Sequence, residues 1–386
     1  MTPELSRPPV LEAAEAICRI DEPLHWTARK NDLMVAACRE LAMYHYAHNR
    51  DIRSIYDRHG FDPRSIREEA DIARIPPIGV TAMKSYTIHT RPASECVLNL
   101  TSSGTRGQKT QIWFDQESLD RCQAQLTGQW TQEGLVSDRR TNYLSFNYDP
   151  TDAGNLGTAF ADKNQQRFAP VARSYSTIRK NAAGAWESRQ DDILRVLSEY
   201  EQEGLPVRIF AMPAFLYETL LEMKARNLTL KLPAGSFVGT GGGWKAAEDK
   251  QISRAEFRAT ITERLGIPAE WIRDGYGMAE HCAPYIECKK HRLHVGVYTR
   301  IIVRDPVTLA PLPKGQPGLV ELVTPFNTMM PNLAILTTDI GRIDADACDC
   351  GWESPTFTVL GRGGITKHKG CALTANEIVR RSSASR

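Results

Sequence analysis

The chain has 386 residues, of which 41% are hydrophobic and 24% are charged, and its formal net charge is +2. This composition is that of an ordinary soluble globular protein, large enough for one domain with subdomains. The small net charge argues against a nucleic-acid partner. No run of 18 apolar residues occurs, so we expect no membrane span, and the first residues do not resemble a signal peptide. We therefore expect a cytoplasmic location.

The first half of the chain predicts helices and strands in alternation. Apolar residues at helical spacing predict an amphipathic helix over residues 31–48, with His45 on one of its faces. Residues 75–80 are typical of a connector. A helix is expected to begin near Asp115, an acceptable N-cap, and residues 141–147 are typical of a strand.

The second half adds further strands, and hairpins follow near its end. We expect strands at 207–211 and 236–240, a helix from Pro213 to about Arg226, a helix at 254–265, an alternating strand at 297–303 and a hairpin partner at 319–323. Strands alternating with helices early and hairpins late predict a mixed α/β architecture.

A polar loop follows the apolar pair Val97-Leu98. It contains hydroxyls, glycines and one lysine, namely Thr101, Ser102, Ser103, Gly104, Thr105, Gly107 and Lys109. Free backbone N–H groups, hydroxyls and an ammonium are suited to binding a polyphosphate. The spacing is not that of a Walker A loop, because Gln108 rather than glycine precedes the lysine. The alternative is a polar surface turn.

A second motif runs from Asp274 to His281. Glycines on both sides of Tyr276 would let an adenine approach the ring, and Glu280 offers a hard oxygen ligand for Mg²⁺ near phosphates. The alternative is a strand and turn with an incidental aromatic residue.

Two further residues could bind a ribose. A carboxylate at a strand end, such as that of Asp339, can accept both hydrogen bonds of a ribose diol. Arg362 follows Gly361 in a plausible hinge, and its guanidinium could also reach the ribose. The alternative for both residues is a solvated surface position, where Asp and Arg usually lie.

In this order, the four motifs resemble those of the adenylate-forming superfamily, from about residue 75 to 378. Gly239–Gly243 resembles the superfamily's adenine-pocket loop, including Gly241, Gly242 and Gly243, while Tyr276-Gly277 and Asp339 match its tyrosine and ribose motifs. Ala279 stands where the tyrosine motif usually has Thr, and Thr338-Asp339 resembles the Thr-Gly-Asp ribose motif with its Gly missing. The resemblance implies that ATP activates a carboxylate as an acyl-adenylate, with Asp274 among the ATP-binding residues.

Within this superfamily, the chain resembles the branch of LuxE-type acyl-protein synthetases. The resemblance lies in segments 241–245, 276–281 and 369–373. In that branch a cysteine near the C-terminus accepts the acyl group before a partner reductase receives it, and Cys371 is the matching residue. Its basic neighbours, including Lys367 and Lys369, would favour the thiolate. The alternative for Cys371 is a small buried apolar residue. Fatty and aromatic acids both remain open as substrates.

The resemblance also implies a domain division. We expect an adenylation domain over residues 1–360, with a helical part to about residue 75, and a much shortened C-terminal remnant at 361–386. The catalytic lysine of the usual C-terminal domain would then have no counterpart. Lys109, Lys245, His281 or Lys367 would instead supply positive charge at the α-phosphate.

The nine cysteines are odd in number, and five lie after residue 280. In a reducing compartment they are expected to be thiols or metal ligands rather than a disulfide framework. Cys288, His294, Cys348 and Cys350 suit a closed, structural Zn²⁺ site and resemble an arrangement in phenylacetate-CoA ligase relatives. His291 competes as a ligand, Cys282 less so, and thiols that are neighbours by chance are the alternative.

The favoured hypothesis is an acid–thiol ligase using ATP and Mg²⁺, with transfer to Cys371 or to a thiol on a partner. Alternatively, the adenylate passes to CoA, a carrier protein or a reductase. A third hypothesis, from another class, is a non-catalytic protein that binds nucleotide or acyl groups.

Overall fold

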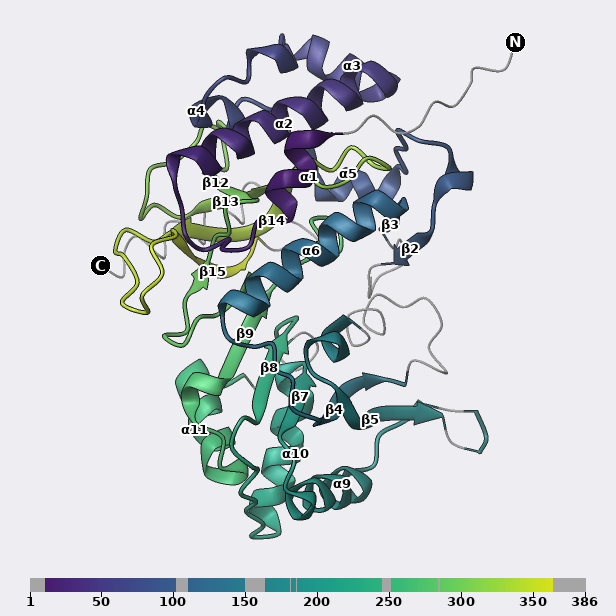
Figure 1. Cartoon of the computed structure of the whole chain (residues 1–386), viewed down its shortest axis with the longest axis vertical. Coiled ribbons are helices and arrows are strands. Elements are labelled where there is room, and N and C mark those ends of the chain that lie inside the picture. The colour runs from purple at the N-terminus through teal and green to yellow at the C-terminus, as the bar shows by residue number, and fades with distance from the viewer. Residues whose placement is uncertain are drawn as a thin grey trace.

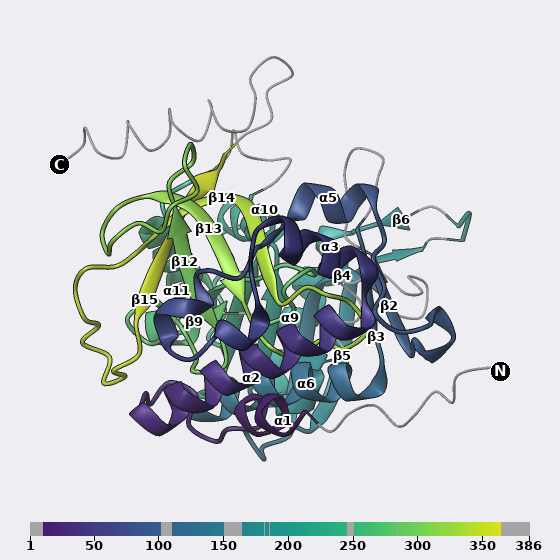
Figure 2. The same cartoon turned by 90° about the horizontal axis from the view of Figure 1, so that it is seen from above.

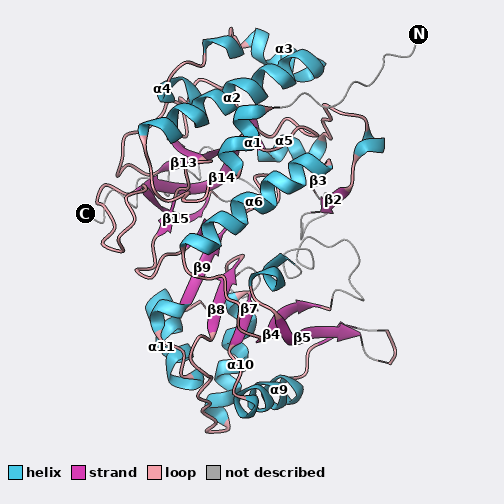
Figure 3. Ribbon diagram, viewed as in Figure 1, coloured by secondary structure: helices cyan, strands magenta, loops and turns pink. Residues whose placement is uncertain are grey.

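The computed structural model describes residues 11–101, 110–149, 164–180, 182–184, 186–244, 251–283 and 285–363. Two larger β-sheets lie one above the other in Figure 1, with helices packed against each of them. Figure 3 separates the helices from the strands by colour. This arrangement confirms the expected mixed α/β architecture.

The N-terminal helices cover one end of the molecule. They are α1 (Glu12–Cys18), α2 (Ala28–His48), α3 (Arg50–Arg58) and α4 (Glu69–Ile72), followed by α5 (Val80–Ser85). The Thr27 side chain caps α2 by accepting a hydrogen bond from the N–H of Lys30 at 3.2 Å. The expected helix over 31–48 is therefore confirmed as the greater part of α2. Figure 2 shows α1, α2 and α6 side by side.

The six-stranded sheet has the order β11-β15-β14-β13-β12, and β1 pairs with β14. Its strands are β1 (Ile78–Gly79), β11 (Leu293–His294), β12 (Arg300–Arg304), β13 (Gly318–Val323), β14 (Ala334–Ile343) and β15 (Thr356–Arg362). All its pairings are antiparallel except that of β1 with β14.

Two local expectations in this region were wrong. The connector at 75–80 contains β1 and the start of α5, because β1 gains its hydrogen bonds from the distant strand β14. The strand expected at 297–303 begins only at Arg300. Before it, the N–H of Thr299 donates to the carbonyl of Gly296 in a turn, and the apolar residues Val297 and Tyr298 are buried without belonging to a strand.

The seven-stranded sheet has the order β10-β9-β8-β7-β4-β5-β6, and its central strands are parallel. The strands are β4 (Thr141–Tyr148), β5 (Val171–Lys180), β6 (Trp186–Glu187), β7 (Val207–Ala211), β8 (Phe237–Gly241), β9 (Ile272–Tyr276) and β10 (Tyr285–Ile286). The helices α9 (Gln190–Glu203), α10 (Pro213–Ala225) and α11 (Arg254–Leu265) connect parallel strands.

A small hairpin and one long helix complete the described fold. The hairpin consists of β2 (Leu98–Thr101) and β3 (Gln111–Phe114), and α6 (Gln116–Gln132) follows it. The Asp115 carboxylate caps α6 by accepting from the N–H of Ser118 at 2.9 Å, as the sequence predicts. Within the described residues, no helix is both long and apolar enough to cross a membrane.

Candidate active site

The predicted phosphate-binding loop is the connection of the β2–β3 hairpin. Thr101 at the end of β2 pairs with Gln111 at the start of β3. Residues 102–109 lie outside the described residues, so the roles expected for Ser102, Ser103, Gly104, Thr105, Gly107 and Lys109 stay predictions. The structure shows which strands carry this loop and what holds them.

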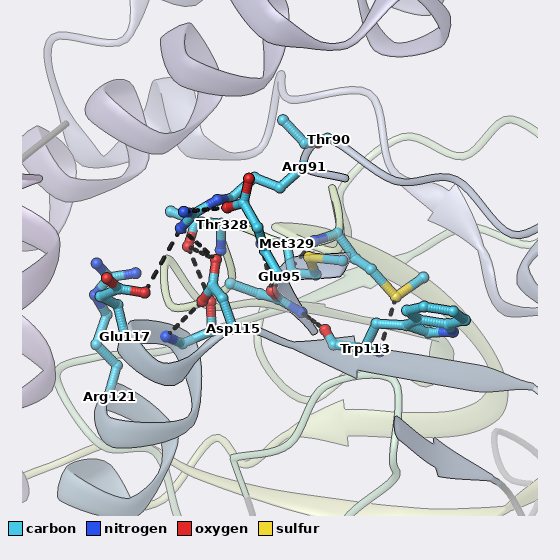
Figure 4. Close-up of polar contacts among 12 residues, drawn as sticks. Thr90, Arg91, Glu95, Trp113, Asp115, Glu117, Arg121, Thr328 and Met329 are labelled. Atoms are coloured by element: carbon cyan, nitrogen blue, oxygen red, sulfur yellow. Dashed lines mark hydrogen bonds and ion pairs between the residues drawn. The ribbon is translucent and has the colours of Figure 1, made fainter. Parts of the chain in front are cut away.

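An ionic cluster holds the base of this hairpin, as Figure 4 shows. The Arg91 guanidinium contacts the carboxylates of Glu95, Asp115 and Glu117, at 2.9 Å for Asp115 and 3.5 Å for Glu117. The Thr328 hydroxyl donates to the Asp115 oxygen that Arg91 also contacts, at 2.7 Å from Oδ2. Of these residues the sequence identified only Asp115, as a helix cap, because contacts such as that with Thr328 join residues distant in the chain.

Three of the predicted nucleotide-binding residues meet where the two sheets join. The Tyr276 hydroxyl at the end of β9 donates to Asp339 Oδ2 on β14 at 2.8 Å. Arg362 on β15 lies opposite Asp339, with its Nε 3.6 Å from Asp339 Oδ1. Burial and the negative charge of Asp339 raise the pKa of Tyr276 well above its ordinary value, so the hydroxyl remains a donor.

The expected adenine-side residues also lie together. Gly241 at the end of β8 pairs with Gly275 of β9, and Gly242 and Gly243 continue with positive φ values of 78° and 67°. The Thr240 hydroxyl donates to Asp274 Oδ1 at 2.9 Å. Burial and the neighbouring Glu287 raise the pKa of Asp274 above its ordinary value.

A cavity of about 150 Å³ opens beside this loop. Its lining includes Thr240, Gly243, Trp244, Arg254 and Asp274. Position 275 favours glycine, because a Cβ there would lie a tight 3.3 Å from the carbonyl oxygens of Thr240 and Tyr285. Gly277 follows β9 and is exposed.

Glu280 and His281 lie in surroundings that the sequence did not predict. Both side chains are buried, and the carbonyl of Glu280 accepts from the Asn332 amide at 2.7 Å. His281 stacks on Tyr285 and shares a 2.9 Å hydrogen bond with its hydroxyl. Burial lowers the pKa of His281 to about 3. A neutral imidazole supplies no positive charge, so the function proposed below gives His281 no cationic role.

The structure brings together the four predicted zinc ligands. The ligand atoms of Cys288, His294, Cys348 and Cys350 all lie within 4.8 Å of one another. Cys350 Sγ is 3.2 Å from His294 Nε2, and the other ring nitrogen of His294 is 2.8 Å from the Ser354 hydroxyl. Such a second contact fixes the orientation of a metal-binding imidazole.

The two alternative ligands are engaged elsewhere. His291 Nδ1 is 3.6 Å from a carboxylate oxygen of Glu287. Cys282 forms a disulfide with Cys122 of α6, which corrects the expectation that the cysteines are all thiols or metal ligands. Sequence spacing could not reveal this pair, because the two residues are 160 positions apart. Lys245, Lys367 and Cys371 lie outside the described residues, so their roles stay predictions.

Comparison with known proteins identifies the family of this chain. The family described as acyl-protein synthetase, LuxE, matches residues 13–380. A long-chain-fatty-acid–luciferin-component ligase of Vibrio harveyi is 25% identical over 357 residues, which are 92% of this chain and 90% of that protein. A phenylacetate-coenzyme A ligase of Thermus thermophilus is 24% identical over 327 residues, covering 81% of this chain and 65% of that protein.

Solved structures agree at the level of the fold. A crystal structure of 2-hydroxyisobutyryl-CoA ligase with 2-HIB-AMP and CoA superimposes with a TM-score of 0.66, at 15% identity, over 92% of this chain and 72% of that one. With the family match covering nearly the whole chain, this protein belongs to the acyl-protein synthetase (LuxE) family and is an acid–thiol ligase of the adenylate-forming type.

Proposed function

We propose that this protein binds Mg·ATP where its two sheets join and uses it to activate a carboxylic acid. A carboxylate oxygen attacks the α-phosphorus, the bond to the β-phosphate oxygen breaks, and acyl-AMP and pyrophosphate result. The observation that carries this proposal is the meeting of Tyr276, Asp339 and Arg362, which come from three strands in two sheets.

Asp339 is the proposed ribose-binding group. Its two carboxylate oxygens face Tyr276 and Arg362, so the carboxylate has a fixed orientation before the nucleotide arrives. Each oxygen can accept more than one hydrogen bond, which leaves capacity for the two hydroxyls of a ribose. The Arg362 side chain is 81% exposed and can turn toward the nucleotide.

The base is proposed to lie against the loop Gly241–Gly243, near Asp274 and the cavity beside it. Glu280 is the proposed Mg²⁺ ligand, since a carboxylate oxygen next to phosphates suits this hard cation. Lys109, Lys245 and Lys367 remain the proposed sources of positive charge at the α-phosphate.

The second step passes the acyl group from the adenylate to a thiol. The proposed acceptor is Cys371, whose sulfur attacks the acyl carbon and releases AMP, or else a thiol on a partner such as an acyl reductase. CoA and a carrier protein are the alternative acceptors. The Vibrio harveyi relative is named for long-chain fatty acids, and this name supports fatty acids as the first candidate substrates.

Carboxylate-dependent exchange of labelled pyrophosphate into ATP tests the first step. We expect exchange with at least one acid in a panel of fatty and aromatic acids. Complete absence of exchange over the panel, with ATP still bound, would instead support a non-catalytic binding protein.

The acceptor is tested by incubating the protein with ATP and the labelled acid that supports exchange. We expect covalent label on the wild-type chain and none on Cys371→Ser, while both exchange pyrophosphate. Equal labelling of the variant would exclude Cys371 as the acceptor.

We also propose that Cys288, His294, Cys348 and Cys350 hold a structural zinc ion. Three sulfurs and one imidazole form a complete tetrahedral set without an open position for catalysis. Further support comes from backbone N–H groups that donate to the sulfurs, those of Lys290 to Cys288 and of Trp352 to Cys350. The ion would supply no chemistry to the reaction, and it would tie the 288–294 turn to the 348–354 turn.

Metal analysis of the purified protein tests the zinc proposal. We expect about one zinc per chain, since one closed tetrahedral set needs one ion. We further expect Cys348→Ser to lower both the zinc content and the melting temperature. A metal-free protein, with a Cys348→Ser variant as stable as wild type, would contradict the proposal.

A further inference from the structure

A loop with no regular secondary structure is buried along its whole length. It covers residues 324–333, between β13 and β14, and every residue in it is buried. Buried loops are uncommon, because their backbone polar groups must find partners away from water. We call residues 324–333 the buried loop.

One end of the buried loop holds the phosphate-loop hairpin and α6. The Thr328 hydroxyl donates to Asp115 at 2.7 Å, and its N–H donates to the Ser118 hydroxyl at 2.9 Å. The Asn327 amide donates to the carbonyl of Trp113 on β3 at 3.3 Å. Figure 4 shows Thr328 and Asp115 below Arg91.

The other end holds the Glu280 motif. The Asn332 amide nitrogen donates to the backbone carbonyl of Glu280 at 2.7 Å, and Asn332 is 0% exposed. Two residues later the chain enters β14, the strand that carries Asp339. The buried loop is therefore in contact with the phosphate-loop hairpin and the Glu280 motif, and it continues directly into the ribose-binding strand.

We propose that Asn332 is a positioning residue that sets the place of the Glu280 carboxylate relative to Mg·ATP. The inference rests on the proposed role of Glu280 as a Mg²⁺ ligand. Asn332 touches neither metal nor nucleotide. It fixes the backbone from which the Glu280 side chain extends, and a shift there moves the carboxylate away from the metal position. Groups that orient metal ligands in this way typically change metal affinity by about 10- to 100-fold when removed.

The test is the Mg²⁺ dependence of pyrophosphate exchange at saturating ATP and acid. For Asn332→Ala we expect the half-saturating Mg²⁺ concentration to rise about 10-fold or more, with much of the rate recovered at high Mg²⁺. If the alanine variant does not fold, Asn332→Ser, which changes volume and polarity less, replaces it in the same measurement. Melting temperatures of all variants report folding independently of activity.

Asn142 at the start of β4 offers a matched control. It is also 0% exposed, and its amide donates a single 2.7 Å hydrogen bond, to Glu203. In both residues the Oδ1 atom has no hydrogen-bond partner among the described residues. We expect Asn142→Ala to lower stability and leave the Mg²⁺ dependence unchanged.

Three results would overturn the inference, and they are distinguishable. If Asn332→Ala and Asn332→Ser lower the rate equally at every Mg²⁺ concentration, Asn332 is only structural. If Glu280→Gln leaves the Mg²⁺ requirement unchanged, the assignment of Glu280 fails while adenylation stands. If the wild-type protein shows no exchange with any acid at any Mg²⁺ concentration, the proposed function itself fails.

Discussion

At the scale of single residues, the position of Asp339 depends on contacts that span both sheets. Its carboxylate lies between the Tyr276 hydroxyl and the Arg362 guanidinium, although Tyr276 is 63 residues away in the chain. These two contacts do not use up the acceptor capacity of Asp339, since each carboxylate oxygen can accept a further hydrogen bond. Asp339 therefore keeps acceptor capacity for the ribose that we propose it binds.

Removing the Asp339 carboxylate should lower kcat/KM for ATP and have less effect on the stability of the protein. For Asp339→Ala we expect kcat/KM for ATP to fall about 10- to 100-fold, because hydrogen bonds to a charged group are worth about 1.5–3 kcal/mol. Pyrophosphate exchange at varied ATP measures this effect. Tyr276→Phe keeps the ring and Asp339, so its loss should be smaller. An unchanged KM and rate in Asp339→Ala would contradict the ribose role.

At the scale of elements, α6 connects parts of the site that are distant in sequence. It begins at the Asp115 cap beside the phosphate-loop hairpin, and Cys122 in its second turn is bonded to Cys282, directly after the Glu280-His281 pair. Near its other end, Trp130 packs against aromatic residues of the parallel sheet, including Phe210 and Phe237. The helix α6 is therefore in contact with the β2–β3 hairpin, the segment that follows Glu280 and the parallel sheet.

We expect the Cys122–Cys282 bond to be detectable and stabilising. Mass spectrometry of a non-reduced digest should find the two peptides joined. Reductant, or Cys122→Ala, should lower the free energy of unfolding by about 2–4 kcal/mol, the usual effect of a disulfide. Cys96→Ala removes a free, half-buried cysteine and should leave the sensitivity to reductant unchanged. Recovery of only unlinked peptides under non-reducing conditions would contradict this expectation.

At the scale of the whole molecule, two buried histidines make stability depend on pH. His281 bonds to Tyr285, and His45 of α2 bonds to Thr90 and to the carbonyl of Asn327 in the buried loop. Burial lowers the pKa of each to about 3. Between about pH 6.5 and 3 the unfolded chain binds more protons than the folded one, so stability falls as the pH decreases through this range.

The effect should be visible in denaturation at pH 7 and at pH 5. One such histidine lowers the free energy of unfolding by about 2 kcal/mol between pH 6.5 and 5, since each pH unit is worth about 1.4 kcal/mol. His281→Gln is neutral throughout and should reduce the loss of stability on acidification. His59→Gln, at an exposed position, should keep the wild-type slope. Equal slopes in wild type and His281→Gln would contradict the buried, neutral state.

The local features of this protein were readable from its sequence. Helical spacing predicted most of α2, an aspartate cap predicted the start of α6, and the segments 141–147 and 207–211 predicted β4 and β7. Residue types and motif order also selected Tyr276, Asp339 and Arg362 and the set Cys288, His294, Cys348 and Cys350, and the structure brings the members of each set together. Periodicity, capping and motif order depend on neighbours in the chain.

Only the tertiary structure decided features that depend on distant contacts. It showed β1 pairing with β14, His294 rather than His291 among the cysteines, and Cys282 bonded to Cys122. It also showed that His281 is buried, and this burial lowers its pKa to about 3. The physical reason is common to these cases: strand pairing, sulfur neighbours and burial are set by residues far away in sequence, and one sequence without its fold does not specify which distant groups meet.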